Sequence, residues 1–338
     1  MDLNRRARRL GLTVILCALV LRLYDAGAFR WAAETLTAPD AAAFLLFLET
    51  GRRAETGEGY AVSFPPESAA PVFARETLPE TTGETVPETD PPGYAQPEAV
   101  SVYYACSLRP DPAALLALPL TLDLSGDGPT VLILHTHTTE SYTKDGEDYV
   151  ETSDYRTLDE DYNMLSIGAE VARLLEAGGV TAIQDRSLHD YPSYNGSYSH
   201  ARKTIRQYLS QYPTIRLVLD LHRDAADTAS GQLRTLAATD TGTCAQLMLV
   251  MGSSASGLTH PNWERNLSLA LKLQAVLERE TPGITRSTVL RAQRFNQDLS
   301  PGCLLVEVGA AGNTHEEALR AAGKLAEGIL ALAAENSP

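Results

Sequence analysis

Short runs of almost wholly apolar residues, separated by segments with helical spacing, constrain the fold more than any other feature of this sequence. Residues 130–135 (TVLILH), 215–221 (IRLVLDL) and 303–308 (CLLVEV) are nearly continuous apolar runs of strand length. A strand with one wet face alternates polar and apolar side chains, whereas a continuous apolar run is typical of a strand buried on both faces. These runs therefore predict central strands of a covered sheet.

Helical periodicity fills the intervals between these strands. Residues 163–177 place apolar side chains at helical spacing and end at Gly178 and Gly179, a typical helix stop. Further helices are predicted over residues 199–209, 266–280 and 314–333, and further strands over residues 180–184 and 244–251. Strands that alternate with helices predict an α/β fold with a largely parallel central sheet flanked by helices.

The N-terminal third has a different composition. Four arginines between positions 5 and 9 precede the apolar run of residues 10–21, and a basic flank before an apolar core is an export signal. We predict that residues 1–29 form an uncleaved membrane anchor, with a cleaved signal as the alternative. Residues 30–99 should contain a helical segment and then a Pro/Thr/Glu-rich linker that cannot bury a core. The folded, extracytoplasmic domain should be residues 100–338.

Charge and cysteine content exclude several kinds of protein. The net charge of −15 disfavours binding to nucleic acid, because the phosphate backbone would repel the chain. The four cysteines form no CxxC pair, which disfavours a zinc ribbon or a thioredoxin-type site. Cys106, Cys244 and Cys303 are expected to be free buried thiols, and one disulfide bridge is the alternative.

Polar clusters occur in or at the ends of the apolar strands. They are residues 135–142 (HTHTTESY), residues 220–224 (DLHRD) and Glu307. Open α/β sheets bind ligands at the carboxyl ends of their strands. Zinc takes imidazole and carboxylate ligands and keeps one position for water in catalytic sites. His137, Glu140 and His222 therefore predict a Zn²⁺ site.

Glu307 is unusual because it interrupts an otherwise apolar strand. A buried carboxylate is costly unless it is paired or functional, so we predict that Glu307 is the general base beside the metal, with a structural ion pair as the alternative. His135 is a rival ligand to His137 if the strand continues through both, and otherwise it lies behind the site or faces the substrate. An acid in residues 159–161 is the rival to Glu140.

Other polar residues are candidates for contact with the substrate. Tyr194, Asn195 and Tyr198 form a polar-aromatic loop that suits a flat sugar-peptide strand, although ordinary packing explains it equally well. Arg223 is expected either to hold a peptide carboxylate by a bidentate contact or to pair with Asp224 or Glu307. The remaining histidines are expected to be solvated: His189, His200, His260 and His315.

Four segments in one order resemble the stage II sporulation protein P family. They are ILHTHTTESY (133–142), HDYPSYNGSY (189–198), YPTIRLVLDLHRDA (212–225) and PGCLLVEVGAAGNTHEEA (301–318). This family is similar to zinc-dependent N-acetylmuramoyl-L-alanine amidases. The resemblance implies His137, Glu140 and His222 as zinc ligands and Glu307 as the catalytic glutamate. The Thr-rich turn replaces the Gly-rich turn and the longer gap before the glutamate that are usual in those amidases.

The resemblance also implies a biological role. It implies hydrolysis of peptidoglycan at the amide and at the peptide cross-link, during endospore engulfment, together with the stage II sporulation proteins D and M. Two alternatives are a zinc carboxypeptidase, which would need an arginine for the free carboxylate of its substrate, and a non-catalytic wall-binding scaffold.

The predicted anchor has a direct test. Because the basic flank should stay in the cytoplasm, cell fractionation should find the full-length chain in the membrane, with its C-terminal domain cleaved by protease added from outside. Protection of that domain in the cytosol would contradict both the topology and a cell-wall substrate.

Overall fold

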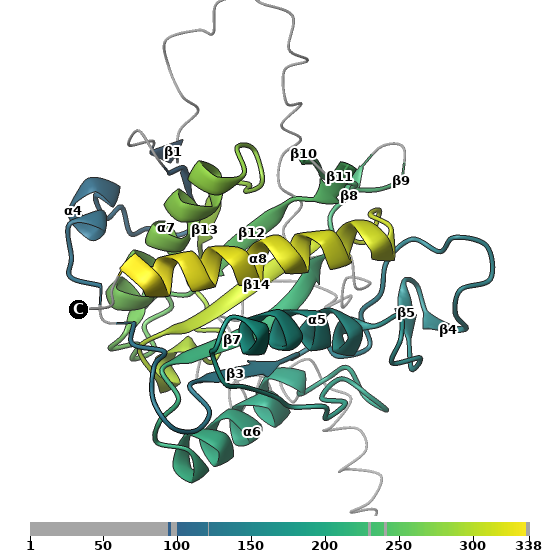
Figure 1. Ribbon diagram of the computed structural model, residues 1–338, viewed down its shortest axis with the longest axis horizontal. Coiled ribbons are helices and arrows are strands. Elements are labelled where there is room, and N and C mark those ends of the chain that lie inside the picture. Colours follow the sequence, from purple (N-terminus) through teal and green to yellow (C-terminus); the bar gives the residue numbers. More distant parts are fainter. Residues whose placement is uncertain (1–93, 96–99, 121, 229–230, 240–241, 336–338) are drawn as a thin grey trace, which may run out of the picture. The chain divides into compact units, whose positions relative to one another are not determined.

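The computed structural model describes residues 94–95, 100–120, 122–228, 231–239 and 242–335 (Figure 1). Its centre is an eight-stranded sheet with the order β1-β2-β13-β12-β14-β7-β3-β6. The strands are β1 Tyr94–Ala95, β2 Val102–Tyr104, β3 Val131–Leu134, β6 Ala182–Gln184, β7 Leu217–Asp224, β12 Leu247–Met251, β13 Thr288–Leu290 and β14 Cys303–Ala310. β12 is antiparallel to β14 and β1 to β2, and the other neighbours are parallel. The predicted α/β class is confirmed.

Helices and short hairpins complete the described part of the chain. The helices are α4 Pro112–Leu116, α5 Met164–Ala177, α6 Ser197–Gln211, α7 Trp263–Glu280, the 3₁₀ helix η1 Gln297–Leu299 and α8 His315–Glu335. Three two-stranded hairpins lie outside the main sheet: β4 Glu151–Ser153 with β5 Arg156–Thr157, β8 Asp227–Thr228 with β9 Gly231–Gln232, and β10 Leu236–Thr239 with β11 Gly242–Ala245.

The central strands are apolar throughout because both of their faces are covered. In β3, Val131 and Ile133 belong to the core formed with α5, α7 and α8, whereas Leu132 and Leu134 pack on the opposite face with Ala201 of α6 and its neighbours. Figure 1 shows α5 and α8 over one side of the sheet and α6 apart from them, beside β3. All four side chains of β3 are completely buried. The sheet is thus a middle layer, as the continuous apolar runs predict.

The structure differs from the sequence-based prediction in one long strand and in several short elements. The predicted strand over residues 244–251 is two strands, because β11 pairs with β10 in a hairpin while β12 pairs with β14 in the sheet. β2 and β13 were not predicted, because three residues are too few to show a periodic pattern. The predicted anchor and the linker up to residue 93 lie outside the described residues. Within the described ranges, no helix combines the length and apolarity needed to span a membrane.

Helix α5 fits tightly against the end of β3. Its N-terminus is capped by Asn163, whose side chain accepts the Leu165 N–H at 2.9 Å, and its C-cap is Gly178, as predicted. On its buried face, Gly168 leaves room for the His135 ring, since a Cβ at that position would lie 2.6 Å from Nε2 of His135. This glycine lets the helix approach the polar turn that follows β3.

Replacing Gly168 by alanine should therefore destabilise the protein, by about 1–3 kcal/mol, because the gain in helix propensity is smaller than the cost of overpacking. Gly323→Ala in α8 is the matched control. Its new Cβ would meet Leu174 at an ordinary 3.7 Å, so the change should be neutral or stabilising by up to about 1 kcal/mol. Urea unfolding of the purified variants measures both. Equal stabilisation by the two substitutions would contradict the close fit.

Candidate active site

The turn after β3 presents the first polar cluster. β3 ends at Leu134, so no strand runs through both His135 and His137. Asp220 of the neighbouring strand β7 holds the turn, because its carboxylate accepts the Thr136 N–H at 2.7 Å and the Thr136 hydroxyl at 2.6 Å. The turn reverses the chain and carries His137 forward to the strand ends.

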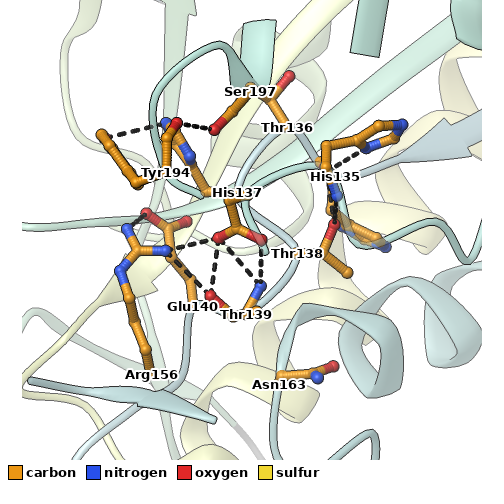
Figure 2. A network of polar contacts seen from close by, with 12 residues as sticks. His135, Thr136, His137, Thr138, Thr139, Glu140, Arg156, Asn163, Tyr194 and Ser197 are labelled. Atoms are coloured by element: carbon orange, nitrogen blue, oxygen red, sulfur yellow. Dashed lines mark hydrogen bonds and ion pairs between the residues drawn. The ribbon is translucent and has the colours of Figure 1, made fainter. Parts of the chain in front are cut away.

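His135 lies behind this turn. Its Nδ1 is 3.1 Å from the carbonyl oxygen of Leu221 and its Nε2 is 3.1 Å from Nε2 of Gln184. Burial lowers the pKa of His135 to about 4, so the ring is neutral near pH 7. Figure 2 shows this ring directed away from His137. Because both ring nitrogens of His135 contact groups of the protein, this residue does not suit a metal ligand. Its position fits the other predicted role, a residue that lies behind the site.

His137, Glu140 and His222 come together although they arise from two separate segments. Oε2 of Glu140 lies 3.6 Å from Nδ1 of His222, and the rings of His137 and His222 meet edge to face at 5.2 Å between centroids. All three residues are buried. The Nδ1 of His137 is buried without a hydrogen-bond partner, while its Nε2 is 3.2 Å from the hydroxyl of Tyr194 (Figure 2).

His222 lies between two carboxylates. Its Nε2 is 3.1 Å from Oδ1 of Asp220, on the side opposite to Glu140. Burial opposes a charge on this ring, yet the two flanking carboxylates raise the pKa of His222 well above its usual value. Asp220 therefore orients the His222 ring and stabilises its positive form in the metal-free protein.

Glu140 is held as a carboxylate. Burial alone would raise its pKa, but Arg223, His222, His137 and Arg156 together keep the pKa of Glu140 well below its usual range. Its Oε1 lies 3.4 Å from Nη2 of Arg156, and its Oε2 accepts the Arg223 backbone N–H at 3.2 Å.

The rival acids do not share this environment. All three acids of residues 159–161 are exposed, and Glu160 forms an ion pair with Arg186 at the surface. Their exposure favours Glu140 over this rival.

Glu307 stands beside His222 on the adjacent strand. The two residues are partners in the parallel register of β14 and β7. Glu307 is partly exposed, its Oε2 has no hydrogen-bond partner, and burial raises its pKa to about 8. No ion pair involves Glu307 within the described part of the chain. The alternative of a structural ion pair with an arginine therefore does not hold.

The Arg223 side chain is held by groups of the protein. Its Nε donates to the Ser141 carbonyl at 3.0 Å and its Nη2 to the Tyr155 carbonyl at 3.0 Å, and Nη1 lies 3.7 Å from Glu140. The neighbouring Asp224 pairs with Arg286 instead. The guanidinium thus supports the turn and Glu140. The predicted pairing with Asp224 or Glu307 is not present, whereas a contact with a substrate carboxylate stays a prediction.

An aromatic wall, formed by Tyr194, Tyr198 and Phe295, lines one side of the site. The Tyr194 ring stacks on His137 at 4.5 Å between centroids. Tyr198 meets His137 edge to face at 5.6 Å, is parallel to the His222 ring at 6.4 Å and has Phe295 behind it at 5.9 Å. Asn195 is exposed beside this wall. The predicted tyrosines therefore lie at the site, and Phe295 joins them from a segment that the sequence did not single out.

The other histidines are mostly less exposed than predicted, and the cysteines are free as predicted. His189 and His260 are buried, and His315 is partly buried, so the prediction that they are solvated was wrong, whereas His200 is exposed as expected. His189 is buried because its ring joins the His135 carbonyl at 2.8 Å to the Thr204 hydroxyl at 2.9 Å. Cys106, Cys244 and Cys303 are free thiols, the first only partly buried, so the prediction of free cysteines is confirmed for them.

The residue types of His137, Glu140 and His222 suit a zinc ion, and one of the distances between them does as well. In the described part of the chain, no three His, Cys, Asp or Glu side chains converge closely enough to hold an ion as they stand. However, two ligands of one tetrahedral zinc ion lie roughly 3.3 Å apart, close to the 3.6 Å between Glu140 and His222. Asp220 behind His222 and Tyr194 behind His137 resemble the hydrogen-bonding partners that orient metal-bound imidazoles. The Nδ1 of His137, which has no hydrogen-bond partner in the protein, is the third atom that could bind the metal.

The sequence of this chain matches a known protein family. The sequence model of the family described as "Stage II sporulation protein P (SpoIIP)" matches residues 73–330. This chain belongs to the stage II sporulation protein P family. A curated relative, Stage II sporulation protein P of Bacillus subtilis (strain 168), is 28% identical over an alignment of 217 residues that covers 60% of this chain and 51% of the relative. The chain thus matches about half the length of that relative.

Solved structures of amidases show a remote likeness. N-acetylmuramoyl-L-alanine amidase AmiC2 of Nostoc punctiforme is 16% identical, with a TM-score of 0.37, over 62% of this chain and 98% of that chain. The CwlD amidase of Clostridioides difficile, solved in complex with the GerS lipoprotein, is 16% identical, with a TM-score of 0.35, over 61% of this chain and 98% of that chain. Identities and TM-scores this low allow no conclusion about the activity of this chain.

The raised pKa of Glu307 has a consequence for stability. Because the folded metal-free protein holds this proton up to about pH 8, the contribution of Glu307 to stability should fall as the pH rises from the ordinary carboxyl pKa of 4.5 toward 8. Glu307→Gln removes this penalty. The variant should match the parent near pH 4.5 and become progressively more stable than it above that, with a slope of at most about 1.4 kcal/mol per pH unit.

Urea unfolding in the presence of a chelator, repeated from pH 4.5 to 8.5, measures this difference. The exposed Glu147→Gln variant is the control for the loss of one charge. A difference between parent and Glu307→Gln that stays constant with pH would show that Glu307 is not a destabilised carboxyl.

Proposed function

We propose that this chain is a zinc-dependent peptidoglycan hydrolase, an N-acetylmuramoyl-L-alanine amidase that acts during endospore engulfment. The observation that carries the proposal is the position of Glu307, an unpaired carboxyl next to His222 and beside the cluster of His137 and Glu140. Membership of the stage II sporulation protein P family supports the sporulation context.

The metal would be held by His137, Glu140 and His222. Zinc in such a site acts as a Lewis acid toward water and toward the carbonyl of the scissile amide. The residues around the ligands set their chemical state. Asp220 directs the ring of His222, and the arginines beside Glu140 keep it deprotonated, as a metal ligand must be.

Glu307 would move the proton. General acid–base catalysis works best when the pKa of the catalytic group is near the working pH, and burial brings the pKa of Glu307 to about 8. The Oε2 atom of Glu307 is buried without a hydrogen-bond partner in the protein, while the residue as a whole is partly exposed, so the carboxyl keeps unused hydrogen-bonding capacity beside the proposed metal site. Glu307 would take a proton from the attacking water and deliver it to the leaving amine.

The aromatic wall would hold the substrate. Tyrosine and phenylalanine offer flat apolar faces that pack against sugars and peptide groups, and tyrosine adds a hydroxyl. Tyr194 is nearly half exposed, at 45%, so part of its side chain is available for such contact. Cleavage of the peptide cross-link, an N-terminal membrane anchor, and association with the stage II sporulation proteins D and M complete the proposal.

The test separates metal binding from catalysis on one set of purified proteins. The parent should contain about one zinc per chain, and His137→Ala and His222→Ala should each lose it. Glu307→Gln should keep the zinc and the fold while release of soluble peptide from purified peptidoglycan falls about 10²- to 10⁴-fold. Metal content by atomic absorption and thermal melting are measured on the same samples.

Each other outcome rejects a defined part of the proposal. Unchanged metal content in both histidine variants would reject the site. Full activity of Glu307→Gln would show that Glu307 is not the base, and loss of zinc in that variant would make Glu307 a ligand. Wild-type zinc content without any release of peptide would contradict the hydrolase function itself.

A further inference from the structure

A buried network of charges lies beneath the proposed metal site, on the side of Glu140 opposite to His222. It consists of Arg156 from β5, Asp190, Thr139, Glu140 and Tyr194. Figure 2 shows Arg156 beside Glu140 and Thr139, with Tyr194 beyond them. The proposed catalytic chemistry uses neither Arg156 nor Asp190, yet both are charged side chains that have been removed from water.

Asp190 anchors one end of the network. Its side chain is completely buried and accepts a hydrogen bond from Nη1 of Arg156 at 2.7 Å. It also accepts the Thr139 hydroxyl at 2.7 Å and the Thr139 backbone N–H at 3.2 Å. A buried carboxylate with this many donors is held rigidly. Asp190 therefore sets the position of the Arg156 guanidinium and of the turn that carries Glu140.

Arg156 contacts one proposed ligand, Glu140, and the aromatic support of another, His137. Its Nη2 lies 3.4 Å from Oε1 of Glu140, and its Cζ lies 4.9 Å from the centre of the Tyr194 ring. That same ring stacks on His137 and brings its hydroxyl to 3.2 Å from Nε2 of His137. One guanidinium thus contacts a carboxylate and lies over an aromatic ring at the same time, a combination that suits arginine better than lysine.

We infer that Arg156, fixed by Asp190, is a positioning residue that aligns Glu140 and His137 for metal binding. The inference rests on the proposed zinc site. Arg156 would contact neither metal nor substrate and would act by restricting Glu140 and Tyr194. Asp190 balances the charge of Arg156, so that the guanidinium orients Glu140 without drawing the carboxylate away from a cation. Groups behind metal ligands typically change metal affinity about 10- to 100-fold when they are replaced.

The test uses the full-length chain and three changes. Arg156→Lys keeps the charge but loses the planar fork. Arg156→Met alone would leave the carboxylate of Asp190 buried without its partner, so it is combined with Asp190→Asn, which removes both charges together. Zinc affinity is measured by competition with a chelator, folding by thermal melting of the metal-free protein, and activity as separate kcat and KM values. The double variant should melt near the parent but bind zinc about 10- to 100-fold more weakly.

Arg156→Lys should lie close to the double variant in zinc affinity, because a lysine ammonium cannot serve Asp190, Glu140 and the Tyr194 face at once. The loss of activity should appear in kcat when zinc is limiting and diminish when zinc is in excess. The matched control is the pair Arg234→Met and Glu317→Gln, an arginine–carboxylate contact outside the site. This control should lower the melting temperature while leaving zinc affinity unchanged.

The inference is overturned if the double variant or Arg156→Lys binds zinc as tightly as the parent. It is also overturned if weaker zinc binding follows the melting temperature in all variants, the control pair included, because that pattern would show a purely structural role. A parent protein without zinc would overturn the proposed function and this inference together. That result is distinct, because it would be visible in the unsubstituted protein.

Discussion

The burial of β3, β7 and β14 on both faces is the constraint on which the rest of the structure depends. Both faces of these strands enter a core, so the first three residues of each strand are apolar. Polar residues follow toward the carboxyl ends, from Asp220 onward in β7, at Glu307 in β14 and directly after β3. Parallel pairing then places the ends of the three strands beside one another, and His222 of β7 meets Glu307 of β14 in register.

Charge balance is the second determinant of the site. Two carboxylates flank the His222 ring, and two arginines flank Glu140, so each buried charge has a partner of opposite sign nearby. Glu307 is the exception, and the cost of its charge appears as a raised pKa. A site in which one carboxyl differs in this way from its paired neighbours is suited to proton transfer.

Local patterns located most of the regular elements and the principal polar clusters. The helical spacing and the glycine stop of α5 predict its bounds, and the isolated acid in CLLVEV is enough to single out Glu307. Local patterns do not show which charged side chains pair in the folded protein. Asp190 lies 34 residues after Arg156, and no local pattern indicates that their side chains meet. The place of Phe295 in the aromatic wall could not be predicted either, because Phe295 comes from a loop far from Tyr198 in the sequence.

The sequence by itself determined the layered α/β architecture, because the period and length of apolar runs follow directly from which faces are buried. It also determined which residue types were available for chemistry at the strand ends. Only the tertiary structure shows that both ring nitrogens of His135 contact the protein while Nδ1 of His137 has no partner, since this depends on where β3 stops pairing and on the room that Gly168 leaves in α5. It likewise turned Arg223 toward backbone carbonyls, because hydrogen bonds to groups distant in the chain form only after the layers have packed.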